Sequence, residues 1–187
     1  MRIIAGEHKG RRLASVKGAD IRYTSDRLKK SLFSILRDDV PGARFLDLYA
    51  GSGNIGIEAI SRGAGSVAFV DLNPACTKTI SANLARCSLS PKPPRIMLLK
   101  MGMSRAMEYF RRRNIQFDII FLDPPYRLKL VEKTLHDISA CGILSNDGEV
   151  IAEHDVREDV PAQAGKLVMT RQRRYGTTVL SFYSLAD

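Results

Sequence analysis

From residue 43 onward, apolar runs of strand length alternate with segments of helical periodicity. We expect strands at 44–48, 66–70, 95–99, 117–122, 148–153, 166–170 and 177–183, and helices at 53–62, 74–87, 103–112 and 128–140. This alternation predicts an α/β fold with a mostly parallel, seven-stranded sheet and helices on both faces. The last strand has no helix after it, so we expect it to pair antiparallel with its neighbours.

Three of the expected strands end at or just before an acidic residue. Asp47 lies at the end of the first, Asp71 follows the second, and Asp123 follows the fourth. The carboxyl ends of parallel strands meet at one edge of a sheet, and ligands of α/β proteins bind there. We therefore expect the three carboxylates to line one site.

A glycine-rich turn follows the first of these acids. Gly51, Gly53 and Gly56 lie between a strand and a helix, where glycine lets a ligand approach the backbone. Asp71 is placed to accept hydrogen bonds from ribose hydroxyls. The glycines also fit a dinucleotide fingerprint, but Asp47 would repel a diphosphate and attract the cationic amino-acid end of S-adenosylmethionine. We therefore favour a methyl donor over a dinucleotide.

The fourth expected strand runs into the sequence Asp123-Pro124-Pro125-Tyr126. Two prolines stop the strand and stiffen the chain after it, because proline has a fixed φ and no amide hydrogen. The Asp123 carboxylate and the Pro124 carbonyl are acceptors, and Tyr126 offers an aromatic face, which together suit a planar ring bearing an amino group. We predict methyl transfer to an exocyclic base nitrogen, with Asp123, Pro124 and Tyr126 as the catalytic residues.

The amino-acid composition limits the kinds of protein that this chain can be. The 187 residues are 44% apolar and 26% charged, which is ordinary for one globular domain. No apolar run approaches bilayer length and no signal peptide is evident, so we expect a cytoplasmic protein without a membrane partner. The three cysteines and three histidines are scattered, which predicts no metal site.

Basic residues concentrate at the N-terminus of a chain whose net charge is +9. Residues 1–30 hold nine basic side chains against three acidic ones, a pattern typical of a polyanion partner. The alternative is a solvated basic surface. The residues that we expect to contact nucleic acid are Arg2, Lys9, Arg11, Arg12, Arg22, Thr24 and Arg27.

The N-terminal part has its own expected elements. Residues 1–17 predict a β-hairpin, and 26–37 predict a helix that buries one face and leaves Lys29 and Lys30 in water. We expect 1–40 to form a basic, RNA-contacting extension and 41–187 to form the catalytic domain.

With these motifs together, the chain resembles the bacterial 16S rRNA guanine-N2 methyltransferases of the RsmD type. The resemblance covers nearly the whole length and is carried by residues 1–6, 9–11, 22–27, 32–33, 46–53, 56–59, 61–64, 123–126 and 174–177. It implies a Rossmann-like class I methyltransferase that uses S-adenosylmethionine, releases S-adenosylhomocysteine and methylates one guanine of small-subunit rRNA. The implied partner is 16S rRNA or a small-subunit assembly intermediate, and the expected state is a monomer.

The resemblance also implies which residues hold the donor: Asp47, Gly51, Ser52, Gly53, Asp71, Leu72, Met101 and Gly102. The third strand departs from the family pattern. Where an acid commonly meets the adenine amine, this chain has Met103, so we expect backbone groups and apolar packing to hold the adenine.

Two other functions fit the same residues. An adenine-N6 methyltransferase acting on RNA or DNA would use the same pocket chemistry with a different ring. A non-catalytic RNA-binding ribosome-assembly factor could also be built on a methyltransferase scaffold.

Overall fold

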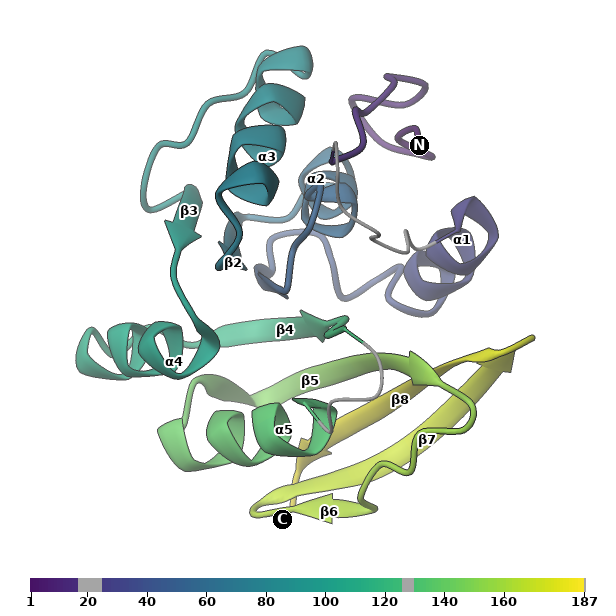
Figure 1. Cartoon of the computed structure of the whole chain (residues 1–187), viewed down its shortest axis with the longest axis vertical. Coiled ribbons are helices and arrows are strands. Elements are labelled where there is room, and N and C mark those ends of the chain that lie inside the picture. The colour runs from purple at the N-terminus through teal and green to yellow at the C-terminus, as the bar shows by residue number, and fades with distance from the viewer. Residues whose placement is uncertain (17–24, 126–129, 187) are drawn as a thin grey trace. The chain divides into compact units, whose positions relative to one another are not determined.

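The computed structural model describes residues 1–16, 25–125 and 130–186. The chain divides into two compact units, Met1–Gly102 and Met103–Asp187 (Figure 1). The first unit contains α1 (Asp26–Ile35), β1 (Arg44–Leu48), α2 (Asn54–Ser61), β2 (Ser66–Asp71), α3 (Pro74–Arg86) and β3 (Ile96–Lys100). The second contains α4 (Met103–Arg112), β4 (Phe117–Leu122), α5 (Leu130–Cys141), β5 (Leu144–Asp155), β6 (Gln163–Ala164), β7 (Leu167–Tyr175) and β8 (Thr178–Leu185).

The first unit is built on three parallel strands in the order β3-β2-β1. The side chains of β1 and β2 are buried almost throughout, as expected for parallel strands covered by helices. Helices α2 and α3 pack against these strands. Gly56 lets α2 approach β2 closely, since a Cβ there would lie 2.3 Å from the Phe69 ring.

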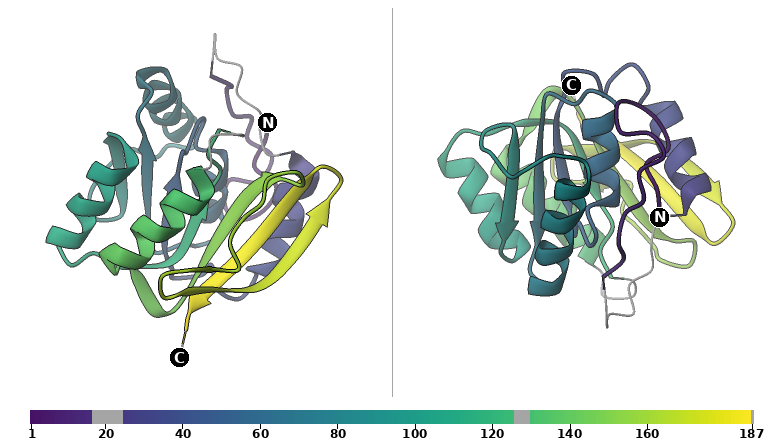
Figure 2. Two further views of the ribbon diagram at one scale, coloured as in Figure 1. Left: turned by 60° about the horizontal axis from the view of Figure 1, so that its bottom comes forward. Right: turned by 90° about the horizontal axis from the view of Figure 1, so that it is seen from above.

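The second unit has the strand order β4-β5-β8-β7-β6, and only β4 and β5 run parallel among its described residues. Figure 2 shows β7 and β8 as a long ribbon, with α4 and α5 packed side by side. The connections after β5 are short, which suits antiparallel strands but cannot span a parallel crossover. The antiparallel pairing expected for the last strand is confirmed.

Seven mostly parallel strands were expected, and this count is not confirmed. The described residues hold eight strands, and β6, β7 and β8 are antiparallel to their neighbours. The additional strand, β6, is two residues long, too short to leave an alternating pattern in the sequence.

The helix expected at 26–37 forms as α1. Ser25 caps it, accepting a hydrogen bond from the Leu28 amide at 3.1 Å. The expectation that Lys29 stays in water is wrong: this side chain is fully buried. Its ammonium donates to the Arg2 carbonyl at 2.7 Å and lies 3.3 Å from the Glu58 carboxylate, partners that local periodicity could not indicate.

The expected N-terminal hairpin is present only in short form. A single antiparallel bridge joins Arg2 and Arg12 in the described part of this region. The Ile3 amide donates to the Arg11 carbonyl at 3.0 Å, and the Leu13 amide donates to the Met1 carbonyl at 3.1 Å. Residues 1–16 therefore fold back on themselves without forming long strands.

None of the helices in the described ranges combines the length and the apolar character needed to cross a bilayer. Among the same residues, no three His, Cys, Asp or Glu side chains gather where they could hold a metal ion.

Candidate functional site

A strained turn joins β1 to α2, and we call residues 49–53 the glycine loop. Gly51 and Gly53 have positive φ angles of 54° and 76°, and so does Tyr49, a non-glycine residue, at 58°. A side-chain-bearing residue pays a free-energy cost of about 1–3 kcal/mol in this region, and such strain clusters at ligand sites. Because α2 begins at Asn54, the loop leads directly into a helix N-terminus, where the first backbone amides have no partner within the helix.

Asp47 lies on β1, just before this loop in the chain, and is almost fully buried, at 2% exposure. Its carboxylate accepts a hydrogen bond from the Gly56 amide at 2.9 Å, which ties the strand end to the first turn of α2. Burial raises the pKa of Asp47 to about 8; the Gly56 bond opposes this rise and nearby Asp71 adds to it. A nearby cation favours the ionised form of a carboxyl, so a bound cation would lower the pKa of Asp47 and promote loss of its proton.

Asp71 ends β2 and bonds directly to the glycine loop. One carboxylate oxygen accepts from the Gly51 amide at 2.9 Å, and the other accepts from the Asn73 amide at 2.8 Å. Asn73 in turn caps α3, accepting from the Ala75 amide at 2.9 Å. The sequence prediction that Asp47, the glycine turn and Asp71 share one edge is therefore confirmed within the first unit.

Two side chains close to Asp71 in sequence are apolar or uncharged. Leu72, expected to contact the donor, is 67% exposed, the one large apolar side chain with this exposure in the described ranges. Cys76 is buried near Asp71, and its burial, together with the Asp71 charge, raises the pKa of the thiol to about 12. The thiol therefore stays protonated at neutral pH and is a poor nucleophile.

The last two expected donor residues follow β3. Lys100, the final residue of β3, lies opposite Asp71 in the parallel register, so Met101 and Gly102 leave the sheet at the same edge. Both are half-buried, and a Cβ on Gly102 would meet no atom within 4 Å. Eight donor-binding residues were expected, and the first unit brings their strand ends together: Asp47, Gly51, Ser52, Gly53, Asp71, Leu72, Met101 and Gly102.

The residues expected to hold the target base belong to the second unit. β4 ends at Leu122, so Asp123, Pro124 and Pro125 leave the strand as the sequence predicted. Asp123 is half-buried, Pro124 is buried and Pro125 is exposed. Tyr126 lies outside the described residues.

Sequence reasoning missed polar residues at the end of the neighbouring strand. In the parallel register Leu122 lies opposite Ala152, and the buried residues Glu153, His154 and Asp155 come next on β5. Three consecutive ionisable residues at the end of an apolar strand were the available signal. His154 bonds to the Ser181 hydroxyl at 2.7 Å, and burial lowers the pKa of its ring.

The basic residues expected to contact nucleic acid are mostly exposed. Lys9, Arg11, Arg12 and Arg27 are exposed, and Arg2 is exposed with a 3.4 Å ion pair to Asp26. Arg22 and Thr24 lie outside the described residues. For the five described residues, the predicted contact with nucleic acid is supported by their exposure and positive charge alone.

Arg86, a further basic residue, was missed because it lies on α3, far from the N-terminus in sequence. The Arg11 guanidinium donates to the Arg86 carbonyl, and the Arg86 guanidinium donates to the Arg12 carbonyl at 3.3 Å. Arg86 therefore extends the N-terminal basic surface onto α3.

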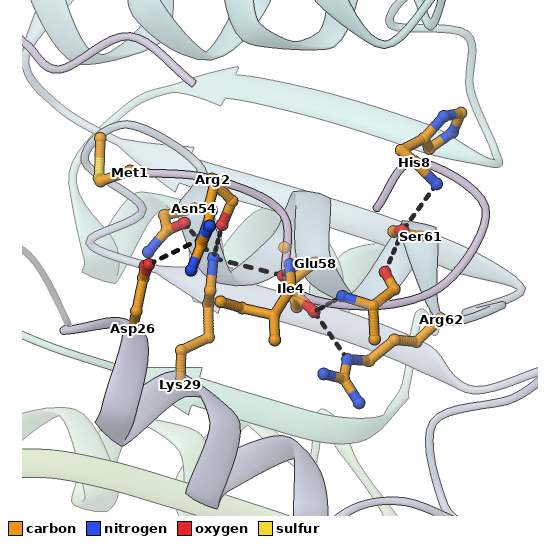
Figure 3. A network of polar contacts seen from close by, with 12 residues as sticks. Met1, Arg2, Ile4, His8, Asp26, Lys29, Asn54, Glu58, Ser61 and Arg62 are labelled. Atoms are coloured by element: carbon orange, nitrogen blue, oxygen red, sulfur yellow. Dashed lines mark hydrogen bonds and ion pairs between the residues drawn. The ribbon is translucent and has the colours of Figure 1, made fainter. Parts of the chain in front are cut away.

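A buried polar network fastens the N-terminal segment, which we define as residues 1–16, to α2 (Figure 3). The Glu58 carboxylate accepts from the amides of Ile4 at 2.8 Å and Ala5 at 3.1 Å. The Ser61 hydroxyl donates to the Ala5 carbonyl at 2.6 Å. Gly6 passes so close to α2 that a Cβ would lie 1.7 Å from the Ser61 carbonyl oxygen.

Comparison with solved structures identifies the class of fold. The structure titled "Putative methyltransferase yhhF from Escherichia coli" matches with a TM-score of 0.81 and 29% identity, covering 100% of this chain and 98% of that one. The fold is therefore that of a methyltransferase.

The sequence comparisons give the family. The family model described as "Conserved hypothetical protein 95" matches residues 1–184, and the chain belongs to this family. The Bacillus subtilis protein named "Putative rRNA methyltransferase YlbH" is 38% identical over 98% of both chains. Ribosomal RNA small subunit methyltransferase D of Escherichia coli is 29% identical over 98% of this chain and 89% of that one. The resemblance to the RsmD type is confirmed.

Proposed function

We propose that this protein transfers a methyl group from S-adenosylmethionine to the exocyclic N2 amine of one guanine in 16S rRNA. The family relationship supports rRNA methylation, since relatives that match over nearly the whole chain carry that activity in their names. The guanine-N2 target is inferred from the similarity to the RsmD type. The structural observation that carries the proposal is the hydrogen bond from the Gly51 amide to Asp71, which joins the glycine loop to the carboxylate suited to a ribose.

The donor residues match the chemistry of S-adenosylmethionine. Asp71 has lone pairs left for ribose hydroxyls beyond those used by Gly51 and Asn73. Leu72 offers an exposed apolar surface suited to an adenine face, and Asp47 offers a carboxyl that ionises more readily beside a cation. In this proposal Gly51, Ser52 and Gly53 hold the amino-acid end, and Met101 and Gly102 lie by the adenine.

In this proposal, Asp123 and Pro124 are the residues that contact the target amine. S-Adenosylmethionine supplies an electrophilic methyl carbon, whose bond to sulfur breaks as the bond to N2 forms. The N2 lone pair is delocalised into the ring. If the Asp123 carboxylate and the Pro124 carbonyl each accept one N2 hydrogen, they bias the nitrogen toward a tetrahedral shape and point its lone pair at the methyl carbon. Orientation of this kind can supply up to about 7–11 kcal/mol.

Asp123 has a second role in the proposal. Positive charge develops on N2 as the new bond forms, and the carboxylate stabilises it. The N2 proton then leaves, either to Asp123 or to water, so no strong base is required. Tyr126 would stack on the base, which must leave its helix to be reached.

We propose that residues 1–40 act as the RNA-contacting extension and 41–187 as the catalytic domain. The exposed basic side chains of the N-terminal segment, together with Arg86, would contact phosphates without reading sequence. The partner would be 16S rRNA or a small-subunit assembly intermediate in the cytoplasm, bound by a monomer.

The test is the Asp123→Asn variant, which keeps the size of the side chain and removes its charge. We expect S-adenosylhomocysteine affinity to be unchanged and the methylation rate to fall by about a hundredfold or more, a loss typical of a transition-state contact. Single-turnover transfer of labelled methyl to unmethylated small-subunit rRNA measures the rate, and calorimetry measures the affinity. Asp159→Asn, an exposed carboxylate of the same unit, is the matched control. Full activity of Asp123→Asn would remove Asp123 from the mechanism.

A further inference from the structure

The N-terminal segment is bonded to residues of the glycine loop as well as to α2. Asn83 of α3 is fully buried, and both its amide oxygen and its amide nitrogen are hydrogen-bonded. Its oxygen accepts from the Ala14 amide at 2.7 Å, and its nitrogen donates to the carbonyls of Ala14 at 3.0 Å and Ser52 at 2.9 Å. One side chain therefore joins residue 14 of the segment to Ser52 of the glycine loop.

A second connection lies directly after the loop, at the start of α2. The Lys29 ammonium donates to the Arg2 carbonyl at 2.7 Å and to the Asn54 side-chain oxygen at 2.6 Å. Asn54 is the first residue of α2, directly after Gly53. The ammonium fixes the orientation of the Asn54 amide, because only the oxygen can accept from it. The segment is thus held next to both Ser52 and Asn54.

We propose that Asn83 and Lys29 are positioning residues that couple the N-terminal segment to the glycine loop, so that donor binding and RNA binding strengthen each other. This inference rests on the proposed function, which assigns the donor to the loop and RNA to the segment. The loop and the segment are expected to move together, since breaking these hydrogen bonds would leave buried polar groups unpaired, which is costly.

The sign of the coupling follows from this geometry. A donor that orders the glycine loop also orders Ser52 and Asn54, and hence the groups that hold residues 2 and 14. RNA binding then costs less conformational entropy, because the segment that it must order is already ordered by the donor. Coupling between binding sites is reciprocal, so RNA raises donor affinity by the same factor.

Hydrogen exchange of the unmodified protein tests the first half of the coupling. With saturating S-adenosylhomocysteine, we expect amides of the N-terminal segment to exchange about fivefold more slowly, the lower end of typical coupling. The informative amides are those of Ile4, Ala5 and Ala14, which bond to Glu58 and Asn83. Protection of residues 49–56 with no change in residues 1–16 would overturn the inference and leave the proposed function intact. Absence of any binding would overturn the proposed function itself.

Affinity measurements test the second half. Unmethylated small-subunit rRNA should tighten S-adenosylhomocysteine binding about fivefold or more in the unmodified protein. Asn83→Leu, which is close in size but forms no hydrogen bonds, should reduce this ratio toward one; a purely structural role would lower stability without changing it. Ser81→Ala, an exposed change on the same helix, should keep the ratio. An unchanged ratio in Asn83→Leu would contradict the role of Asn83.

Discussion

At the scale of single residues, Asp47 shows stability and function in opposition. Its carboxyl is buried, and its raised pKa means that the folded protein holds a proton there at neutral pH. The unfolded chain, with an ordinary pKa of 3.8, does not hold that proton. A charge that would attract the donor's cationic end is therefore unfavourable in the empty fold, a common arrangement at binding sites.

The pH dependence of stability follows from this raised pKa. The Asp47 contribution is fully present below its unfolded pKa of 3.8 and is lost as the pH rises through about 8. Asp47→Asn keeps an acceptor for the Gly56 amide and carries no charge. We expect its advantage in unfolding free energy over the unmodified protein to grow by about 1 kcal/mol per pH unit from about pH 5 to about pH 8. Denaturant unfolding at the two pH values measures this.

The same variant separates the two roles of Asp47. Asp47→Asn should bind S-adenosylmethionine more weakly while it resists unfolding better. A stability difference that is the same at both pH values would show that the carboxyl is already ionised in the fold.

At the scale of elements, a buried ion pair joins α1 to α2. Lys29 and Glu58 have no exposed side-chain surface, and Glu58 also pairs with Arg62 at 2.8 Å. Burial lowers the pKa of Lys29, and the attraction of Glu58 opposes that change. Together with the Ile4 and Ala5 amides, these partners compensate for the loss of hydration on burial.

Removing one partner of this pair should be costly. Lys29→Met keeps the length of the side chain but deprives the Glu58 carboxylate of its buried cation, so we expect a loss of about 3–5 kcal/mol of unfolding free energy. Lys30→Met, an exposed change at the next position, should cost less than about 0.5 kcal/mol. Denaturant unfolding of the two variants compares them. Equal unfolding free energies of Lys29→Met and Lys30→Met would show that the Lys29–Glu58 ion pair does not stabilise the fold.

The sequence predicted the parts of this site that are local. Each strand-end acid follows an apolar run, so Asp47, Asp71 and Asp123 could be placed from chain patterns alone. The burial of Lys29 could not be predicted, because its partners on α2 are distant in sequence. The periodicity of α1 also placed Lys29 on the side of the helix expected to face solvent. Arg86 was missed for the same reason. The strand β6 gave no pattern, since two residues contain no period.

At the scale of the whole molecule, the two units carry different parts of the proposed reaction. The first unit holds the glycine loop, Asp71 and the basic N-terminal segment, and the second holds Asp123 and Pro124. The net charge of +9 favours a polyanionic substrate over a small or neutral one. In the proposed reaction, the first unit binds the methyl donor and the second binds the target base.

The identity of the methylated nucleoside tests the central claim most directly. The unmodified protein would be incubated with methyl-labelled S-adenosylmethionine and unmethylated small-subunit rRNA, and the RNA digested to nucleosides for mass spectrometry. We predict that the label appears in N2-methylguanosine. Label in N6-methyladenosine, or RNA that is bound but never labelled, would contradict the account.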